Sequence, residues 1–203
     1  MTQVDHPSLL ENDGYVVVSN ILSKDICMIA TQHTLFRMVN HFSPDNYQVV
    51  GAHSEYSDTM MESILLFLKP KIEELTGKRL IPTYSFYRIY NEGDKLEDHT
   101  DRPSCEYSVS LTLGYRYNGL SNCYKWPLHF YKGNRMIDVC SGEGDGVIYK
   151  GCELVHGRKT LKSGDGSYHV QLFLHYVDAD GPYAEKYKYD QREIIGIKKE
   201  GQL

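Results

Sequence analysis

The spacing of apolar side chains changes along this chain, from a helical repeat in the first third to a strand repeat after about residue 80. Residues 14–18 are rich in β-branched side chains and predict a short strand. Ser23 then offers an N-cap oxygen to a helix. We expect the buried face of this helix to consist of the side chains that follow at helical spacing: Ile26, Ile29, Ala30, His33 and Phe36.

A second helix is predicted to start near Ser57 or Asp58 and to stop at Gly77, since glycine readily adopts the conformation that ends helices. Its apolar stripe is formed by Met61, Ile64, Leu65, Leu68, Ile72 and Leu75. Pro70 lies within this stretch and cannot donate a backbone hydrogen bond. We therefore expect Pro70 to kink the helix or to split it in two.

From about Leu80 the period of the apolar positions is two. In residues 107–113 and 168–176, apolar side chains alternate with mostly polar ones, which predicts two long strands. Shorter strands are predicted near residues 128–131, 136–139 and 146–149, with turn signals rich in glycine, asparagine and serine between them.

Helices followed by a series of short strands predict an α+β fold, with a helical layer packed on one sheet of a β-sandwich or barrel. No linker, repeat or low-complexity stretch divides the sequence. We therefore expect one domain over residues 1–203, with a helical lead-in over 1–79, a β core over about 80–178 and a mobile C-terminal tail.

Composition and charge narrow the possible functions. With 41% hydrophobic and 24% charged residues, the sequence is typical of a globular domain and unlike disordered, collagen-like or coiled-coil chains. The net charge is −5 and the basic residues are scattered, so we expect no nucleic-acid partner. No apolar run is long enough to span a bilayer, and residues 1–11 do not resemble a secretory signal. We therefore expect no membrane partner and a cytoplasmic location, where the five cysteines are free thiols.

The candidate chemistry centres on His99 and Asp101. Both follow an extended segment, and positions i and i+2 place their side chains on one face. A divalent metal needs a third donor, and His156, which follows a predicted strand and turn, is the best candidate. Two histidines and one carboxylate on one face of the ion are typical of non-haem Fe(II) oxygenases. A second pair, His53 and Glu55, lies in a polar loop with no strand before it, and we discount it.

The sequence around these residues resembles a known family, the iron(II)- and 2-oxoglutarate-dependent dioxygenases, in their prolyl-4-hydroxylase-like branch. The resemblance lies in the motif Tyr90-x-x-Gly93-x-x-Leu96-x-x-His99-x-Asp101, and it continues in residues 126–131, 144–149 and 156–158. It spans roughly residues 84–178. It implies a double-stranded β-helix, or jelly-roll, in which His99, Asp101 and His156 hold Fe(II), with 2-oxoglutarate as cosubstrate and O₂ as oxidant.

The predicted binding site for 2-oxoglutarate departs from that family's pattern. Its members normally hold the far carboxylate with an Arg or Lys on the strand after the distal histidine, but here the aligned residue is His169. A neutral imidazole binds a carboxylate more weakly than a guanidinium does. We favour Arg158, two residues after the distal histidine, with His169 and Arg88 as alternatives. Tyr90 and Thr112, which are expected to point inward, are candidate hydroxyl donors.

The resemblance implies hydroxylation of a C–H bond, with release of succinate and CO₂. Proline, free or in a peptide, is the first candidate substrate. The seventeen tyrosines and the polar positions Ser108, Ser110 and Thr112 favour a polar substrate, either a small molecule or a peptide. Two alternatives stay open: a non-catalytic jelly-roll binding module, because the carboxylate position is atypical, and a cupin-like metalloenzyme that does not use 2-oxoglutarate.

Overall fold

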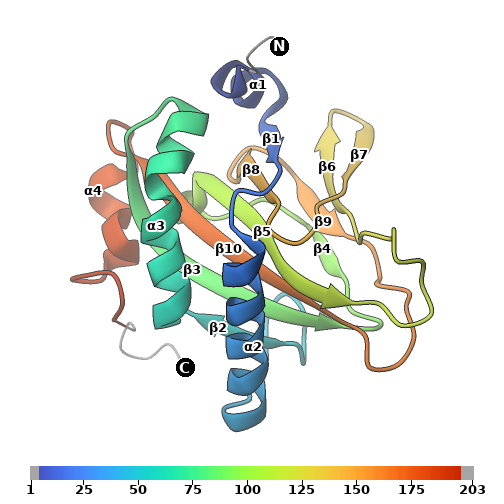
Figure 1. Ribbon diagram of the computed structural model, residues 1–203. Coiled ribbons are helices and arrows are strands. Elements are labelled where there is room, and N and C mark those ends of the chain that lie inside the picture. Colours follow the sequence, from blue (N-terminus) through green and yellow to red (C-terminus); the bar gives the residue numbers. More distant parts are fainter. Residues whose placement is uncertain (1–4, 198–203) are drawn as a thin grey trace.

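The computed structural model describes residues 5–197, which form two antiparallel sheets with helices α2 and α3 against the larger one (Figure 1). The larger sheet has the strand order β1-β8-β5-β10-β3-β2, and the smaller has the order β4-β9-β6-β7. The strands are β1 (Tyr15–Val18), β2 (His53–Tyr56), β3 (Leu80–Asn91), β4 (Leu96–His99), β5 (Tyr107–Arg116), β6 (Leu128–Lys132), β7 (Arg135–Val139), β8 (Gly146–Lys150), β9 (His156–Arg158) and β10 (Tyr168–Asp178). The helices are α1 (His6–Asp13), α2 (Lys24–Asn40), α3 (Thr59–Thr76) and α4 (Ala184–Tyr187), with 3-10 turns η1 (Pro103–Cys105) and η2 (Lys188–Gln191). The predicted α+β class is confirmed.

Strand β10 lies near the middle of the larger sheet and pairs with β3 on one side and β5 on the other. Its alternating sequence sorts side chains between two environments. Val170, Leu172 and Leu174 pack in the main hydrophobic cluster with residues of α2 and α3. His169 and Gln171 point the other way, where they contact polar groups of both sheets. The space between the sheets is therefore polar along this strand.

Helix α3 has the predicted stripe, because all six of its apolar positions are buried. Asp58 caps its start and Gly77, at φ 68°, ends it. The expectation that Pro70 splits the helix is wrong: α3 runs through Pro70 without a break. Pro70 and Leu66 are both exposed, so water can bind the Leu66 carbonyl that the missing N–H leaves free.

Helix α2 begins after Ser23 as predicted, but its expected buried face is correct only in part. Ala30 is buried and Ile26 packs against the main cluster, whereas Ile29 and Phe36 are 56% and 64% exposed. The other buried positions are Cys27, Thr31 and Thr34. They are small because the helix lies close to β5: a Cβ at Gly114 would lie 2.6 Å from the Thr31 hydroxyl. Close packing, rather than the apolar pattern, decides which face is buried.

Two further segments differ from expectation. Residues 53–56, expected to be a polar loop, form strand β2 on the edge of the larger sheet. Residues 193–197, expected to begin a mobile tail, are held in part: Ile195 packs against the main cluster and the Gly196 N–H donates to Glu62 at 2.6 Å. The rest of that tail lies outside the described residues.

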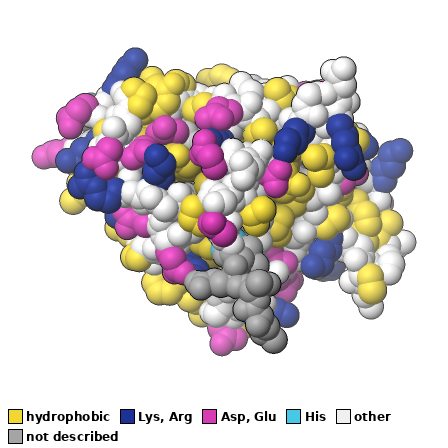
Figure 2. Space-filling model, turned by 90° about the horizontal axis from the view of Figure 1, so that it is seen from above, with side chains coloured by type: hydrophobic (Ala, Val, Ile, Leu, Met, Phe, Trp, Pro, Cys, Tyr) yellow, Lys and Arg dark blue, Asp and Glu magenta, His cyan; other side chains and the backbone are white. Residues whose placement is uncertain are grey.

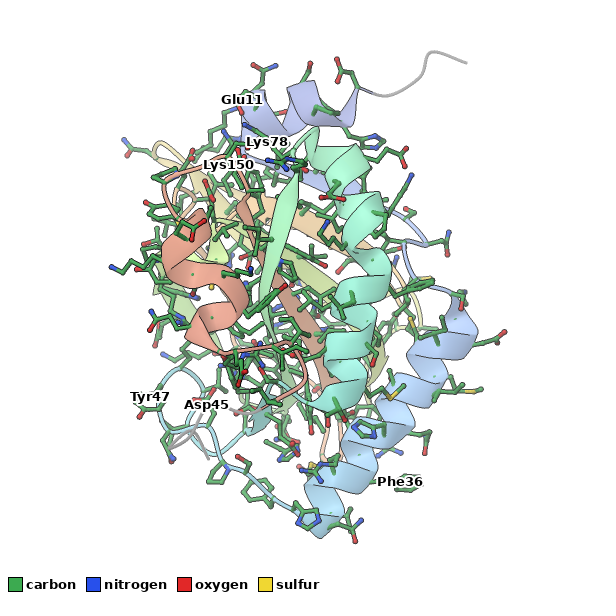
Figure 3. The ribbon with its side chains drawn as sticks, turned by 90° about the vertical axis from the view of Figure 1, so that its left-hand side faces the viewer. Glu11, Phe36, Asp45, Tyr47, Lys78 and Lys150 are labelled. Atoms are coloured by element: carbon green, nitrogen blue, oxygen red, sulfur yellow. The ribbon has the colours of Figure 1, made fainter. Side chains whose placement is uncertain are left out.

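The surface carries charges of both signs. On the face in Figure 2, basic and acidic side chains are interspersed. One ion pair, between Lys150 and Glu11 at 2.8 Å, joins β8 to α1 (Figure 3). All five cysteines lie within the described residues and are free, as predicted. Within residues 5–197, no helix has the length and apolarity needed to cross a bilayer.

Candidate metal centre

Strand register brings the three candidate ligands together. In the smaller sheet, β4 pairs with β9 so that His99 lies opposite His156. Asp101 follows two residues after β4, and its N–H donates to the Gly151 carbonyl at 2.9 Å. A Cβ at Gly151 would lie 2.5 Å from an Asp101 carboxylate oxygen. Glycine at this position therefore makes room for the carboxylate.

The donor atoms of the three side chains converge. One Asp101 carboxylate oxygen lies 3.6 Å from His99 Nε2 and 3.7 Å from His156 Nε2. Taken together, the donor atoms of this group lie within 4.8 Å of one another. This spacing fits one ion placed between them, since metal–ligand bonds of about 2 Å separate neighbouring donors by roughly 3 Å.

Backbone carbonyls orient both imidazoles. His99 Nδ1 lies 2.8 Å from the Glu97 carbonyl, and His156 Nδ1 lies 2.9 Å from the Leu154 carbonyl. A carbonyl only accepts, so each Nδ1 carries the proton and each Nε2 presents a lone pair toward Asp101. This is the tautomer in which histidine binds a metal through Nε2.

Electrostatics favour the ligand form of Asp101 and His156. Burial raises the pKa of Asp101, but its interaction with His99, 3.6 Å away, and the charges of nearby histidines outweigh burial, so the pKa lies below its usual value. Burial lowers the pKa of His99, but the Asp101 carboxylate and the Glu97 carbonyl outweigh burial, so the pKa of His99 lies above its usual value. Burial also lowers the pKa of His156. A carboxylate and a neutral imidazole are the forms that bind a divalent cation, so the donor set fits Fe(II).

A second layer of side chains supports Asp101. The Ser108 hydroxyl donates to the second oxygen of Asp101 at 2.9 Å and accepts from His175 Nδ1 at 2.9 Å. The sequence assigns no such role to Ser108 or His175, because neither residue is part of the motif. The alternation of β5 and β10 was the available signal, since it places both residues on the inner face.

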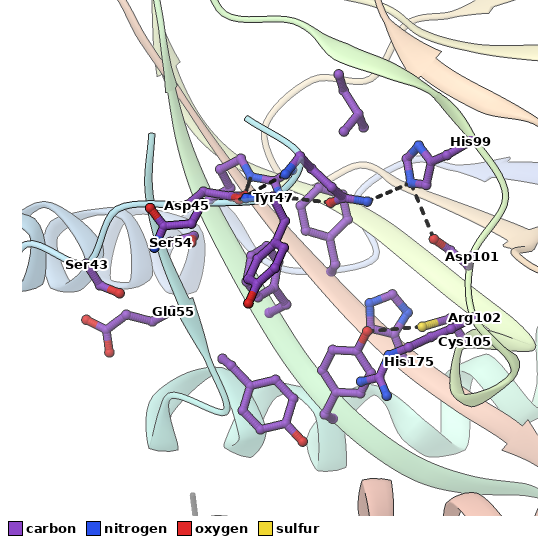
Figure 4. A pocket seen from close by; sticks show the side chains of 18 of the residues that line it. Ser43, Asp45, Tyr47, Ser54, Glu55, His99, Asp101, Arg102, Cys105 and His175 are labelled. Carbon is purple, nitrogen blue, oxygen red and sulfur yellow. Dashed lines mark hydrogen bonds and ion pairs between the residues drawn. The ribbon is translucent and has the colours of Figure 1, made fainter. Parts of the chain in front are cut away.

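The three residues line a cavity of about 1130 Å³. Figure 4 shows it with His99 and Asp101 on one side and Asp45 and Tyr47 on the other. Its walls combine aromatic rings with paired charges, among them Tyr84, Phe86, Arg88, Tyr149 and Phe173. Such a cavity suits an organic substrate that carries polar groups.

Three of the other predicted residues meet at one amide oxygen. Gln171 Oε1 accepts from Arg158 Nη2 at 3.2 Å, from His169 Nε2 at 2.6 Å and from Thr112 Oγ1 at 3.3 Å. All four residues are buried. Sequence reasoning missed Gln171. Three donors compete for one carbonyl oxygen, so the region is rich in donors and poor in acceptors.

Arg158 is the least compensated charge of this group. Its side chain is buried, and one Nη donates to the Trp126 carbonyl at 2.6 Å. Its Nε has no hydrogen-bond partner, and within residues 5–197 no carboxylate forms an ion pair with it. Burial lowers the pKa of Arg158 and holds the pKa of His169 at about 3, so the imidazole is neutral.

Arg88 and Tyr90 form a separate group. Arg88 lines the cavity, donates to the Tyr90 hydroxyl at 3.0 Å and is paired with the Asp45 carboxylate. The discounted His53 is buried beside Tyr87. It is not part of any group of side chains in the described residues that could hold a metal ion.

Comparison with known proteins gives matches at the level of the fold. No family model and no curated protein matches the chain. Among solved structures, SnoK, a non-haem α-ketoglutarate-dependent carbocyclase from nogalamycin biosynthesis, is 13% identical, with 94% of this chain and 88% of its own covered and a TM-score of 0.69. The protein has the fold of these oxygenases.

Two prolyl hydroxylases are similar to the same degree. One from Pseudomonas putida is 15% identical, with 85% of this chain and 98% of its own covered and a TM-score of 0.63. One from Trichoplax adhaerens, in complex with a peptide fragment of hypoxia inducible factor, is 14% identical, with coverages of 89% and 88% and a TM-score of 0.64. The predicted double-stranded β-helix is therefore confirmed.

Proposed function

We propose that the protein is an Fe(II)- and 2-oxoglutarate-dependent dioxygenase that hydroxylates a C–H bond of a polar substrate. The observation that carries the proposal is the convergence of His99, Asp101 and His156 at the wall of a cavity, in a fold shared with such oxygenases. Protein ligands occupy one side of the proposed ion, and the cavity gives small molecules access to the other.

Fe(II), when bound, would activate O₂, the oxidant: one oxygen atom would enter the substrate C–H bond as a hydroxyl, and the other would enter the succinate formed with CO₂ from 2-oxoglutarate. The chain itself contributes orientation. The carbonyls of Glu97 and Leu154 fix the two imidazoles, and Ser108 fixes the carboxylate of Asp101. Aromatic rings form part of the wall of the cavity beside these residues.

Arg158 is our proposed partner for the far carboxylate of 2-oxoglutarate. A buried guanidinium without a carboxylate is costly, and an anionic ligand would relieve that cost. His169 and Thr112 donate to the same Gln171 oxygen as Arg158 and would be further donors for the carboxylate. Since these donors now bond Gln171, the amide has to turn away when the carboxylate binds. Arg88 lines the cavity, but Asp45 already neutralises its charge.

For the substrate, proline in a peptide is the first candidate. Two structural neighbours are prolyl hydroxylases, and one of them is in complex with a peptide. The cavity has room for a peptide segment, and its tyrosine and arginine side chains supply polar contacts. A free amino acid is the alternative that the same chemistry allows.

The direct test measures Fe(II) binding and the turnover of 2-oxoglutarate in the same protein. Apoprotein is loaded with Fe(II) without oxygen, given 2-oxoglutarate and then air, and succinate is measured by mass spectrometry. We expect one Fe(II) per chain and slow succinate formation without substrate, and we expect His99→Ala/Asp101→Ala to lose both. His6→Ala/Asp138→Ala, which removes a histidine and an aspartate outside the centre, is the matched control. Full iron binding without succinate, with or without proline peptides, would contradict the proposal.

A further inference from the structure

The chain between α2 and β2 crosses one side of the cavity, and we call residues 42–51 the strap. The strap is closed on itself by backbone bonds, among them Gly51 N–H to the Asp45 carbonyl at 3.0 Å. Val49 anchors it in a small hydrophobic cluster with Tyr90 and Trp126. Asp45, Tyr47 and Gln48 line the cavity. The strap is therefore attached through Val49, and residues 45–48, which we call its tip, lie at the cavity of the metal centre.

Asp45 organises this tip. Its side chain is 4% exposed and accepts hydrogen bonds from the N–H groups of Tyr47 at 2.8 Å and Gln48 at 3.0 Å. The same carboxylate binds the guanidinium of Arg88, which lies in β3. Tyr47 is 94% exposed and points away from the sheets, while Asp45 lies on their side (Figure 3). Asp45 thus holds the backbone at Gln48 in place.

Gln48 reaches from the strap to a candidate metal ligand. Its Oε1 accepts from Arg88 Nη2 at 2.9 Å, and its Nε2 lies 3.1 Å from His99 Nε2. Because His99 Nδ1 donates to the Glu97 carbonyl, His99 Nε2 is the acceptor of this bond. The amide N–H of Gln48 therefore occupies the lone pair of His99 that faces Asp101.

A metal ion at the proposed centre needs that same lone pair. An imidazole nitrogen has one lone pair and cannot both accept this hydrogen bond and coordinate an ion. We propose that Gln48 is a gating residue that bonds His99 in the metal-free protein and is displaced from it when the metal binds. This inference rests on the metal centre of the proposed function and adds a second state to it.

Displacement of Gln48 has a consequence for the cavity. Arg88 Nη2 loses the Gln48 oxygen as an acceptor, whereas its charge stays paired with Asp45. An N–H donor at the cavity wall is then free for an oxygen atom of the substrate. Loading of the metal and recognition of a substrate carbonyl or carboxylate are therefore coupled through one side chain, and the coupling is reciprocal.

The test compares the affinity for Mn(II), which binds such centres without reacting with oxygen, across variants of Gln48. Gln48→Leu and Gln48→Asn both lose the bond to His99, and we expect each to bind Mn(II) about three- to tenfold more tightly than the wild type. Asn46→Leu is the matched control, since it changes an amide of the same strap that lines the cavity without contacting His99. Its affinity is expected to stay within twofold of the wild type.

Wild-type or weaker affinity in both Gln48 variants would overturn the gate. Agreement between the leucine and asparagine variants matters because either alone could disturb the strap, and thermal melting confirms that each is folded. His99→Ala separates the two proposals. Mn(II) binding that His99→Ala leaves unchanged would refute the metal centre itself, while binding that is lost in His99→Ala but unchanged in both Gln48 variants would refute only the gate.

Discussion

The metal centre and the donor cluster around Gln171 differ in how their polar groups are satisfied. At the centre, the backbone holds both imidazoles, and three donor atoms point at one another across less than 4.8 Å. Around Gln171, side chains bond side chains, and a neutral amide takes hydrogen bonds from a cation. The first arrangement needs an added cation to be complete. The second contains a buried cation, Arg158, that has no carboxylate partner among the described residues.

The two places therefore have different roles in the proposed enzyme: one binds the metal, and the other binds the cosubstrate. The strand register of β4 and β9 places the proposed iron ligands His99 and His156 opposite each other, so their backbone positions are set before the ion binds and only the Gln48 side chain has to move away. The cosubstrate carboxylate meets a cluster that first has to release Gln171. Changes at the two places should therefore have separable effects, on metal affinity in one case and on the Michaelis constant for 2-oxoglutarate in the other.

The largest effect is expected at the metal centre. His156→Ala leaves two ligands, and we expect the Fe(II) affinity to fall by about 100-fold or more, with loss of succinate formation. Metal analysis and calorimetry measure the affinity. Retention of tight binding would show that His156 is not a ligand.

A smaller effect, confined to the cosubstrate, is expected at Arg158. Arg158→Ala removes the only cation of the donor cluster, and loss of a buried charge pair corresponds to about 2–5 kcal/mol. The KM for 2-oxoglutarate should rise by about 30-fold or more, with the Mn(II) affinity within twofold. Arg158→Lys is the conservative control and should recover part of the loss. An unchanged KM would assign the role to His169 or Arg88.

Two serines on one face of β5 give the sharpest comparison. Ser108 contacts Asp101, whereas Ser110 accepts from Gln171 at 2.9 Å. We expect Ser108→Ala to weaken Mn(II) binding by about tenfold and to leave the KM for 2-oxoglutarate nearly unchanged. Ser110→Ala should change that KM and leave Mn(II) binding unchanged. Equal effects of both variants on both quantities would contradict the separation.

The smallest effect is expected far from both places. Phe36 is exposed on α2, so Phe36→Ala should change the free energy of unfolding by no more than about 0.5 kcal/mol. Chemical denaturation measures it. A loss of about 2 kcal/mol or more in the free energy of unfolding would indicate that Phe36 is buried, as the apolar pattern of α2 predicts.

Features that depend on neighbouring positions could be predicted from the sequence. Helix α3 has a regular stripe that is buried, and the alternation of β10 decides which of its side chains face the helices. The grouping of His99 and Asp101 follows from their spacing. His156 is distant from His99 in sequence, and its role could be predicted only because the turn before β9 suggests that the chain returns toward His99.

Features that depend on close packing or on distant side chains could not be predicted. The buried face of α2 is set by Gly114 on β5, which no local pattern reveals. Gln171 was missed because an amide in an alternating strand has no distinctive motif. Gln48 contacts a residue 51 positions away, from a strap for which the sequence predicts neither a helix nor a strand. In each case tertiary contacts supply the information.

The most direct test of the central claim is a crystal structure of the protein with Mn(II) and N-oxalylglycine, an unreactive analogue of 2-oxoglutarate. The account predicts one ion bound by His99 Nε2, Asp101 and His156 Nε2, with the far carboxylate of the analogue at Arg158 and Gln48 turned away from His99. An ion bound without these three side chains, or no ion at this place, would contradict it.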